Sequence, residues 1–416
     1  MRNVYMAGGC HTPYIGKFHP DFVWKKHPDF GRRENPDTEA YLNGISRQIC
    51  EMFGITGAAF DRAYVGNFVG ELFDNQGHLG ALVAASMPGL SGRPIARVEG
   101  ACASGGLAIA AGVDAIRAGA DLVYVVGVEV QTTRSARDGA DFLARASHYK
   151  RQRQLDPFTF PALFARRVQA VVAATETTMD DMALASVKAY GNANLNPLAH
   201  MYTVSMSLDR ARTADARNPN FLANEALTQW LRVSDCSQVS DGASALILAS
   251  EVGLEKLGCR PDECLDILAC EVATLSMAED GHPLRLESVE TASKRAYDRA
   301  GIKASDIDIA EVHDCFTIAE LLAYEALGFI EPGRGFSLLR EGTTARHGSC
   351  PVNPGGGLVG FGHPVGATGV KQLVELWRQA THQCGDYQVN SDLRYGLAAN
   401  MGGDDRTAVV TLCRAG

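Results

Sequence analysis

The stretch ARVEGACASGGLAIAAG, residues 96–112, places one cysteine among glycines, alanines and a serine, where a strand-like run gives way to a helix-like run. Small side chains around Cys102 permit a sharp turn and a close approach of the backbone to a ligand. The N–H groups at the start of the following helix favour a negative charge, so we expect them to lower the pKa of the Cys102 thiol and to hold an oxyanion. Cys102 is therefore either a nucleophile or a small buried residue where larger side chains do not fit.

Short, continuous apolar runs recur along the chain and are typical of strands buried on both faces. Helix-like runs such as residues 107–119 and 317–329 lie between many of them. This alternation predicts α/β layers in which helices cover sheets. The strand-like runs are residues 2–9, 121–130, 244–250, 265–274, 307–314 and 407–413.

The organisation along the chain suggests two halves with a boundary near residues 255–262, which we place as 1–255 and 256–416. A strand-like run opens each half, which hints at duplication. Residues 131–235 are richer in Arg, Asn, Asp and Pro and have few strand-like runs, so we interpret them as a loop excursion from the first half.

Composition excludes several classes of protein. The 416 residues are 46% hydrophobic and 21% charged, with a formal net charge of −9, whereas a nucleic-acid binder needs a basic face. The 11 cysteines and the lack of a secretory start predict free thiols in a reducing, cytoplasmic setting. Cys259, Cys264 and Cys270 lack the paired spacing of a zinc site, and no apolar run approaches the ~20 residues that cross a membrane.

The tripeptide Gly-His-Pro occurs twice and supplies candidate bases for Cys102. His363 lies in the glycine-dense stretch NPGGGLVGFGHPVGATG, where glycines let the backbone and imidazole approach a ligand. His282 is followed by an ordinary charged helix. We therefore expect His363 to be the functional copy and His282 to lie in a turn.

The stretch EVHDCF ends a strand-like run and begins a helix-like run. In open α/β sheets, ligands bind beyond the carboxyl ends of strands, where such loops gather. His313 and Cys315 are therefore candidates for the same site as Cys102. The alternative is a helix cap by Asp314 with a buried cysteine beside it.

Together, these stretches resemble the thiolase family, in its sterol-carrier-protein-type branch. The resemblance rests on Cys102 in GACASGG, His313 and Cys315 in HDCF in place of the usual Asn-Glu motif, and His363 in GHPVGATG. It extends over nearly the whole chain, from YMAGGCHTPYIGK to NMGGDDRTAVVTL. It implies the thiolase fold, in which two similar α/β halves form a layered α-β-α-β-α core.

The resemblance also implies the activity of an acyltransferase, a 3-oxoacyl-CoA thiolase or acetyl-CoA acetyltransferase. Cys102 would attack the 3-keto carbon of a 3-oxoacyl-CoA, with His363 as general base. His363 and His313 would hold the enolate oxygen of acetyl-CoA, and Cys315 would protonate the enolate and then deprotonate CoA. The reverse is a Claisen condensation. Coenzyme A is a substrate, and neither a metal nor a permanently bound cofactor is implied.

A second oxyanion hole is implied at Cys102, built from its own N–H and a glycine N–H near the C-terminus. Most thiolases have their second cysteine there, in Cys-x-Gly, whereas this chain has Asn400-Met401-Gly402. We expect Gly402 rather than Gly403 to donate. Ser237, in VSDCSQVSDGASALIL, matches the serine that touches pantetheine in the family.

Two charged stretches have open roles. Lys150, Arg151 and Arg153 either meet CoA phosphates or form a solvated charged face. The run Asp404-Asp405-Arg406 is unusual in a glycine-rich loop of this family, and either forms an internal ion pair or shapes the pocket.

Several alternatives remain at this point. A condensing relative such as a ketoacyl synthase would leave Cys315 without a role, and a retro-aldolase relative would tend to lack Cys102. A non-catalytic CoA- or lipid-binding thiolase-like protein would not need four reactive side chains. The family implies a homodimer or homotetramer. Some bacterial relatives act with a small zinc-binding partner, so the chain is alternatively the catalytic subunit of such a complex, acting on an aromatic or branched 3-oxoacyl-CoA. Degradation of fatty acids or of aromatics, and the acyl group itself, stay open.

Overall fold

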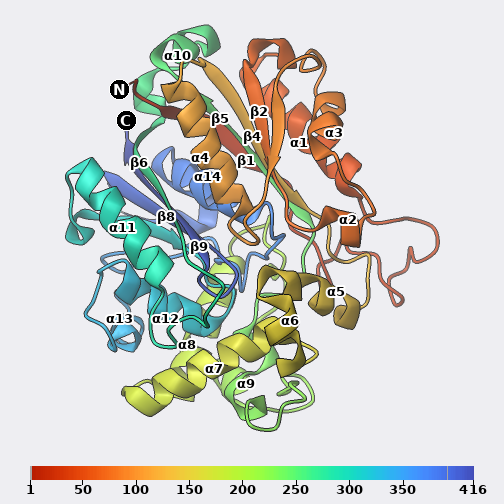
Figure 1. The fold of residues 1–416 in the computed structure, drawn as a ribbon, viewed down its shortest axis with the longest axis vertical. Helices are drawn as coiled ribbons and strands as arrows, with labels where there is room; N and C mark the ends of the chain where they lie inside the picture. The colour runs from red at the N-terminus through yellow and green to blue at the C-terminus, as the bar shows by residue number, and fades with distance from the viewer. Residues whose placement is uncertain (1, 391) are drawn as a thin grey trace.

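The computed structural model describes residues 2–390 and 392–416, whose strands form one hydrogen-bonded sheet with the order β3-β2-β4-β5-β1-β6-β9-β8-β7 (Figure 1). The strands of the first half are β1 (Tyr5–His11), β2 (Arg62–Gly66), β3 (Ile95–Val98), β4 (Leu122–Glu129) and β5 (Gly242–Ala249). Those of the second half are β6 (Leu265–Thr274), β7 (Ile309–Val312), β8 (Tyr395–Gly402) and β9 (Thr407–Ala415).

The two halves repeat one topology. In the first, β2 lies between parallel neighbours β3 and β4, and antiparallel pairs join β4 to β5 and β5 to β1. In the second, β7 pairs in parallel with β8, antiparallel pairs join β8 to β9 and β9 to β6, and a parallel bridge between Ala310 and Val352 takes the place of β3. The halves meet where β1 pairs with β6. The domain boundary after residue 255 stays a prediction; it falls inside α10 (Glu251–Leu257), one short loop before β6.

The helices form three layers around the two halves of the sheet (Figure 1). Strand β4 shows why, because alternate side chains point to opposite faces. Leu122 and Tyr124 pack with α1 (Thr38–Phe53) and α3 (Leu79–Ser86), whereas Val123 and Val125 pack with the central helices α4 (Ser104–Arg117) and α14 (Thr368–Ala380). Strands of the second half pack on the same central helices and, on their other face, on α11 (Glu287–Ala300) and α12 (Thr317–Ala326). The predicted α-β-α-β-α core is confirmed.

Each of the six predicted apolar runs overlaps a strand, and the strand-like run before Cys102 is β3, but β2 and β8 were not predicted. The reason is their composition: β2 includes an arginine, and β8 is rich in small residues and includes Asn400. Outside the excursion, two further short helices are α2 (Gly70–Phe73) and α13 (Gly335–Arg340). None of the helices in the described ranges is long and apolar enough to cross a membrane.

The excursion between β4 and β5 is helical rather than a loop, and it forms the lobe below the sheet in Figure 1. Its packing attaches it to the second half, because Phe164 of the excursion stacks on Phe316 with ring centroids 4.4 Å apart. Its helices are α5 (Ala136–Leu143), α6 (Tyr149–Gln152), α7 (Thr159–Ala174), α8 (Met179–Ala193) and α9 (Leu208–Arg212).

Candidate active site

Cys102 lies in a tight turn immediately before α4. Ala101 has a positive φ of 54°, and the Gly100 N–H donates to Ser104 Oγ at 3.0 Å, which closes the turn. A Cβ atom on Gly105 would lie 2.8 Å from the Gly366 carbonyl oxygen, and one on Gly106 would lie 2.8 Å from Asn400 Oδ1. The small residues after Cys102 are therefore required because the start of α4 contacts segments of the second half.

Three of the four predicted catalytic side chains converge at this turn. The Cys102 sulfur and one ring nitrogen each of His313 and His363 lie within 4.8 Å of one another. The two imidazole rings meet edge to face with centroids 5.0 Å apart. They come from different loops, since His313 follows β7 and His363 precedes α14.

The tautomer of His313 follows from its partner Asn400. The Asn400 amide oxygen accepts from the Gly106 N–H at 3.0 Å, which fixes the orientation of the amide group. Its Nδ2 therefore faces His313 Nδ1 at 3.1 Å, and also donates to the Cys102 carbonyl at 3.1 Å. Because an amide nitrogen can only donate, His313 Nδ1 accepts and the ring proton resides on Nε2.

His363 has the opposite tautomer. The Thr368 hydroxyl donates its single proton to the Pro364 carbonyl at 3.0 Å, so its oxygen accepts from His363 Nδ1 at 2.6 Å. The Nε2 atom of His363 is therefore unprotonated. Burial lowers the pKa of His363 to about 3 and holds that of His313 well below its usual range, so both rings are neutral near pH 7.

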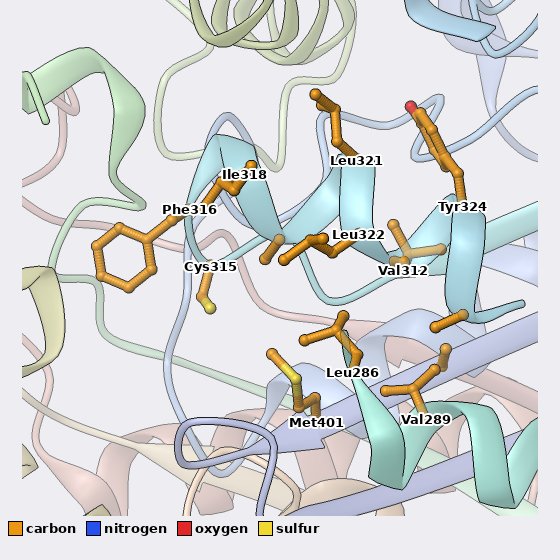
Figure 2. Packing of buried hydrophobic residues seen from close by; sticks show 14 of the residues in the cluster. Leu286, Val289, Val312, Cys315, Phe316, Ile318, Leu321, Leu322, Tyr324 and Met401 are labelled. Carbon is orange, nitrogen blue, oxygen red and sulfur yellow. The ribbon is translucent and has the colours of Figure 1, made fainter. Parts of the chain in front are cut away.

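Cys315 lies at the start of α12, where β7 has ended. Figure 2 shows it beside Phe316 at the end of an apolar cluster that includes Leu322 of α12, Leu286 immediately before α11 and Met401 of β8. This packing fixes α12, which begins two residues after the cysteine. Burial, followed by the neighbouring Cys102, raises the pKa of the Cys315 thiol well above its usual value.

The pKa of Cys102 differs from the expectation. Burial raises the pKa of its thiol to about 12, although the N–H groups of Gly403 and of Cys102 itself act in the opposite direction. The expected lowering by the helix start is therefore wrong for this site, because loss of water outweighs the backbone donors. Cys102 is a neutral thiol at rest, and a base is needed to make it a nucleophile.

The glycine beside the sulfur is Gly403. Its backbone N–H approaches the Cys102 thiol, and Gly403 lines the cavity at the site. Gly402, which we expected to donate, is the last residue of β8, and a Cβ there would lie 2.1 Å from the Gly100 carbonyl oxygen. The geometry therefore favours Gly403 over Gly402 as the donor.

An apolar cavity of about 400 Å³ opens onto these residues. Cys102, Cys315 and His363 line it together with Ser237, whose N–H donates to the Cys315 carbonyl at 2.9 Å. Among the residues that the structure describes, no lysine, arginine, aspartate or glutamate lines this wall. Five phenylalanines do, mostly from the excursion and its surroundings: Phe68, Phe158, Phe160, Phe221 and Phe316.

The remaining charged stretches are engaged within the protein. Asp404 pairs with Arg167 of α7 at 2.6 Å, and the buried Asp405 accepts from the Ser288 N–H at 3.2 Å. Arg406 donates to the Ser276 carbonyl at 2.7 Å. These contacts support the internal-ion-pair interpretation, and they fix the loop that carries Gly403.

Other predicted residues lie away from the cavity wall. His282 forms a turn in which its ring accepts from the Leu284 N–H at 3.2 Å. Arg151 pairs with Asp280 and Arg153 with Asp141, each at 3.2 Å. Cys259, Cys264 and Cys270 are free cysteines.

Three residues that hold the catalytic side chains or their loops in place were not predicted from the sequence: Glu129, Asn400 and Thr368. For Glu129 a signal was present, since it is a lone acid in the otherwise apolar run DLVYVVGVEV. A charge at a fully buried strand position needs partners, and its place at the strand's carboxyl end indicates a site. Asn400 and Thr368 carry no such signal, because their role depends on which nitrogen of a histidine they face.

Comparison with known proteins agrees with this geometry. The family models for the thiolase N-terminal domain and the thiolase C-terminal domain-like region match residues 38–252 and 269–414. An acetyl-CoA acetyltransferase of Methanothermobacter thermautotrophicus is 36% identical over 90% of this chain and 92% of its own length. The benzoylsuccinyl-CoA thiolase subunit BbsB of Thauera aromatica is 31% identical over 83% of this chain and 84% of its own.

More distant relatives extend the comparison. Sterol carrier protein 2 of Oryctolagus cuniculus is 32% identical over 79% of this chain and 60% of its own length. The Ltp2-ChsH2(DUF35) aldolase structure has a TM-score of 0.76 at 18% identity, covering 99% of this chain and 98% of that chain. Acat5 thiolase from Ascaris suum in complex with coenzyme A has a TM-score of 0.69 at 16% identity, covering 99% and 100%. These two structures share the fold. The chain belongs to the thiolase family, in its sterol-carrier-protein-type branch.

Proposed function

We propose that this protein is a thiolase that transfers an acyl group between a 3-oxoacyl-CoA and CoA through an acyl-Cys102 intermediate. The observation that carries the proposal is the convergence of Cys102, His313 and His363 within 4.8 Å, beside a cavity that Cys315 also lines. The sequence similarity to an acetyl-CoA acetyltransferase and to a thiolase subunit supports the same reaction class.

Acylation begins with proton transfer from the Cys102 thiol to Nε2 of His363, the unprotonated nitrogen of that ring. The sulfur then forms a bond to C3 of the substrate, and the C2–C3 bond breaks to leave an acyl-Cys102 thioester and the enolate of acetyl-CoA. A neutral base is required here, because burial keeps the thiol protonated at rest.

The enolate oxygen needs donors that are in place before the bond breaks. His313 offers its Nε2–H, which Asn400 fixes by donating to Nδ1. His363 offers a second N–H once it has taken the thiol proton. The two histidines thus begin the reaction in opposite tautomers and end the first step as two donors.

The oxygen at C3 becomes an oxyanion while the sulfur is bonded to that carbon. We propose that the N–H groups of Cys102 and Gly403 hold it, since both act on the Cys102 sulfur in the resting site. The contacts of Asp404, Asp405 and Arg406 fix the Gly403 loop for this purpose.

Cys315 completes the proton balance. Its thiol gives a proton to the enolate carbon, which releases acetyl-CoA, and the resulting thiolate takes the proton from the incoming CoA thiol. The CoA sulfur then attacks the thioester, and Cys102 leaves and regains its proton from His363. Run in reverse, the same steps form a carbon–carbon bond.

The residues that line the cavity favour a substrate with an uncharged, bulky acyl group. Phe158 and Phe221 meet edge to face at 5.4 Å, and aromatic side chains of this kind favour ring-bearing or branched partners. A carboxylate on the acyl group would lose its water without gaining a cation, because the described part of the wall has no basic residue. Ser237 lines the same cavity and donates its N–H to the Cys315 carbonyl, which supports a contact with the pantetheine chain of CoA as part of the proposal.

A partner subunit is a second part of this proposal. One relative is named as a subunit of a thiolase, and one structure of the same fold is named with a DUF35 partner. We propose that a small second polypeptide, of the zinc-binding kind, assists the chain, and that the chain itself is a homodimer or homotetramer. Native mass spectrometry of untagged protein would show the stoichiometry, and a monomer without any second polypeptide would contradict both statements.

The test of the function is a thiolysis assay in which acyl-CoA products are followed by mass spectrometry. Three substrates separate the alternatives: acetoacetyl-CoA, a 3-oxoacyl-CoA that ends in a phenyl ring, and the same ring-bearing substrate with an added carboxylate. We expect CoA-dependent cleavage that is fastest with the neutral ring-bearing substrate and absent in Cys102→Ala. Binding of all three substrates without cleavage would instead support the non-catalytic alternative.

A further inference from the structure

Strand β4 is apolar until its last residue, Glu129, which is fully buried. Four donors surround its carboxylate: the N–H groups of Phe68 at 2.8 Å, Val69 at 3.2 Å and Gly366 at 3.1 Å, and the Asn67 side-chain amide at 3.1 Å. All four donors are neutral. A carboxylate, which only accepts, is the side chain that satisfies such a set.

One oxygen of this carboxylate connects two walls of the active site. The Oε2 atom accepts from both Phe68 and Gly366, which belong to different halves of the molecule. Phe68 and Val365, the neighbour of Gly366, pack together and both line the cavity beside Cys102. Gly366 lies three residues after His363, in the same loop.

We propose that Glu129 is a positioning residue for the thiolase reaction, which fixes the His363 loop and the Phe68 wall relative to Cys102. This inference rests on the proposed function for its effect on turnover. A glutamine at this position would place an NH₂ group, which cannot accept, against two of the four donors. The loop and the wall would then separate, and the base would lose its alignment with the thiol.

The charge of Glu129 has a second, opposite effect. After burial, this carboxylate is among the groups that raise the pKa of the Cys102 thiol. Burial raises the pKa of Glu129 itself to about 7, so its carboxylate is mostly charged at pH 8. Removing that charge favours the Cys102 thiolate and should make its alkylation about threefold faster at this pH. Loosening that admits water would also lower the thiol pKa, because burial is the largest cause of its rise. Glu129→Asp separates the two effects, since it retains the charge and should leave the alkylation of Cys102 unchanged.

The test compares Glu129→Gln with Asp181→Asn, a control that alters an equally buried carboxylate in the α8 cap and its pair with Arg340. Two rates are measured: turnover of acetoacetyl-CoA, and alkylation of Cys102 by iodoacetamide across pH, located by peptide mapping. For Glu129→Gln we expect turnover to fall about 100-fold, as for a small misplacement of catalytic groups. We expect its alkylation to rise about threefold at pH 8, while Asp181→Asn changes neither rate by more than about twofold.

Unchanged turnover in Glu129→Gln, or an alkylation rate that does not rise, would overturn the proposal. If Glu129→Gln does not fold, Glu129→Asp is used to test the proposal. This variant retains the negative charge, but its shorter side chain cannot reach all four donors. It should keep the wild-type alkylation profile and lose about tenfold in turnover, and wild-type turnover there would overturn the proposal. Absence of turnover in the wild-type protein would count against the proposed function instead, and the alkylation comparison would still test the position of Glu129.

Discussion

The two halves of the molecule share a topology but divide the chemistry. In the first half, the loop between β3 and α4 carries the nucleophile Cys102. In the second, the corresponding loop between Val352 and α14 carries His363, and the loop after β7 adds His313 and Cys315. The repeat thus brings two helix starts together, with the proposed nucleophile before one and the proposed base before the other.

The supporting residues follow the same repeat. Glu129 at the end of β4 binds the loop that follows its parallel neighbour β2, through Phe68 and Val69. Asn400, near the end of β8, binds His313 after the parallel neighbour β7. Equivalent strand ends therefore hold equivalent loops, and the difference is that one loop forms a cavity wall while the other presents a hydrogen-bond donor.

The largest expected effect comes from the single reactive residue of the first half. Cys102→Ala should reduce turnover by about 10⁴-fold or more, because no thioester can form. Its melting temperature should stay within a few degrees of the wild-type value, since the change removes one sulfur atom from a turn. A steady-state assay with a melting curve checks this, and substantial residual turnover would show that the division between the halves is wrong.

Loss of the base in the second half should have the next largest effect. His363→Gln should slow turnover by about 10²- to 10⁴-fold, because general base catalysis is lost together with one enolate donor. Rapid-quench measurement of the first turnover should show that formation of acyl-Cys102 is the step affected. His282→Gln, at the other Gly-His-Pro, is the matched control and should retain wild-type rates; equal losses in both variants would contradict the assignment.

Much of this arrangement was predictable from the sequence, and the remainder was not for physical reasons. The four reactive side chains lie in short glycine-rich or strand-end motifs, so the sequence alone identifies them: Cys102, His313, Cys315 and His363. The choice between Gly402 and Gly403 depends on where β8 ends, and the tautomers depend on donors that lie far away in the sequence. The excursion was expected to shape the pocket, but its folding could not be predicted, because its phenylalanines meet through packing with the second half.

Replacing the hydrogen-bond donor at Asn400 with an acceptor should reduce kcat by a smaller but diagnostic factor. Asn400→Asp retains shape and the Gly106 contact but loses the donor to the Cys102 carbonyl and accepts from His313 Nδ1. The proton of the neutral ring then moves to Nδ1, and Nε2 no longer donates. We expect kcat to fall by about 10²-fold, the usual effect of losing one oxyanion-hole donor. Asn400→Gln provides a control that keeps the donor but displaces it. Wild-type kcat in Asn400→Asp would contradict the tautomer assignment.

The pH dependence of Cys102 alkylation should show which of two opposing effects sets the pKa of its thiol: burial, which raises it, or the start of α4, which lowers it. With a pKa of about 12, Cys102 in the free enzyme should be alkylated about tenfold faster for each pH unit between 7 and 9, without a plateau near 8.5. Because the pKa of His363 is about 3, its protonation should not reduce activity between pH 5 and 7. A plateau in alkylation below pH 8 would mean that the start of α4 dominates over burial.

The smallest effect concerns the cavity wall. Phe158→Ala should lower kcat/KM about tenfold for a neutral ring-bearing 3-oxoacyl-CoA, because the edge-to-face contacts are lost. For acetoacetyl-CoA the value should change by less than about threefold. Phe329→Ala, which removes a partly buried ring away from the cavity, controls for stability. Equal losses for both substrates would place Phe158 outside the acyl site.

Trapping the acyl-Cys102 intermediate tests the proposed reaction. Wild-type protein is mixed briefly, without CoA, with acetoacetyl-CoA or the ring-bearing 3-oxoacyl-CoA, and intact mass spectrometry is followed by peptide mapping. We expect one acyl group on Cys102 that disappears when CoA is added. An acyl group on Cys315, or turnover without any adduct on Cys102, would contradict the proposed reaction.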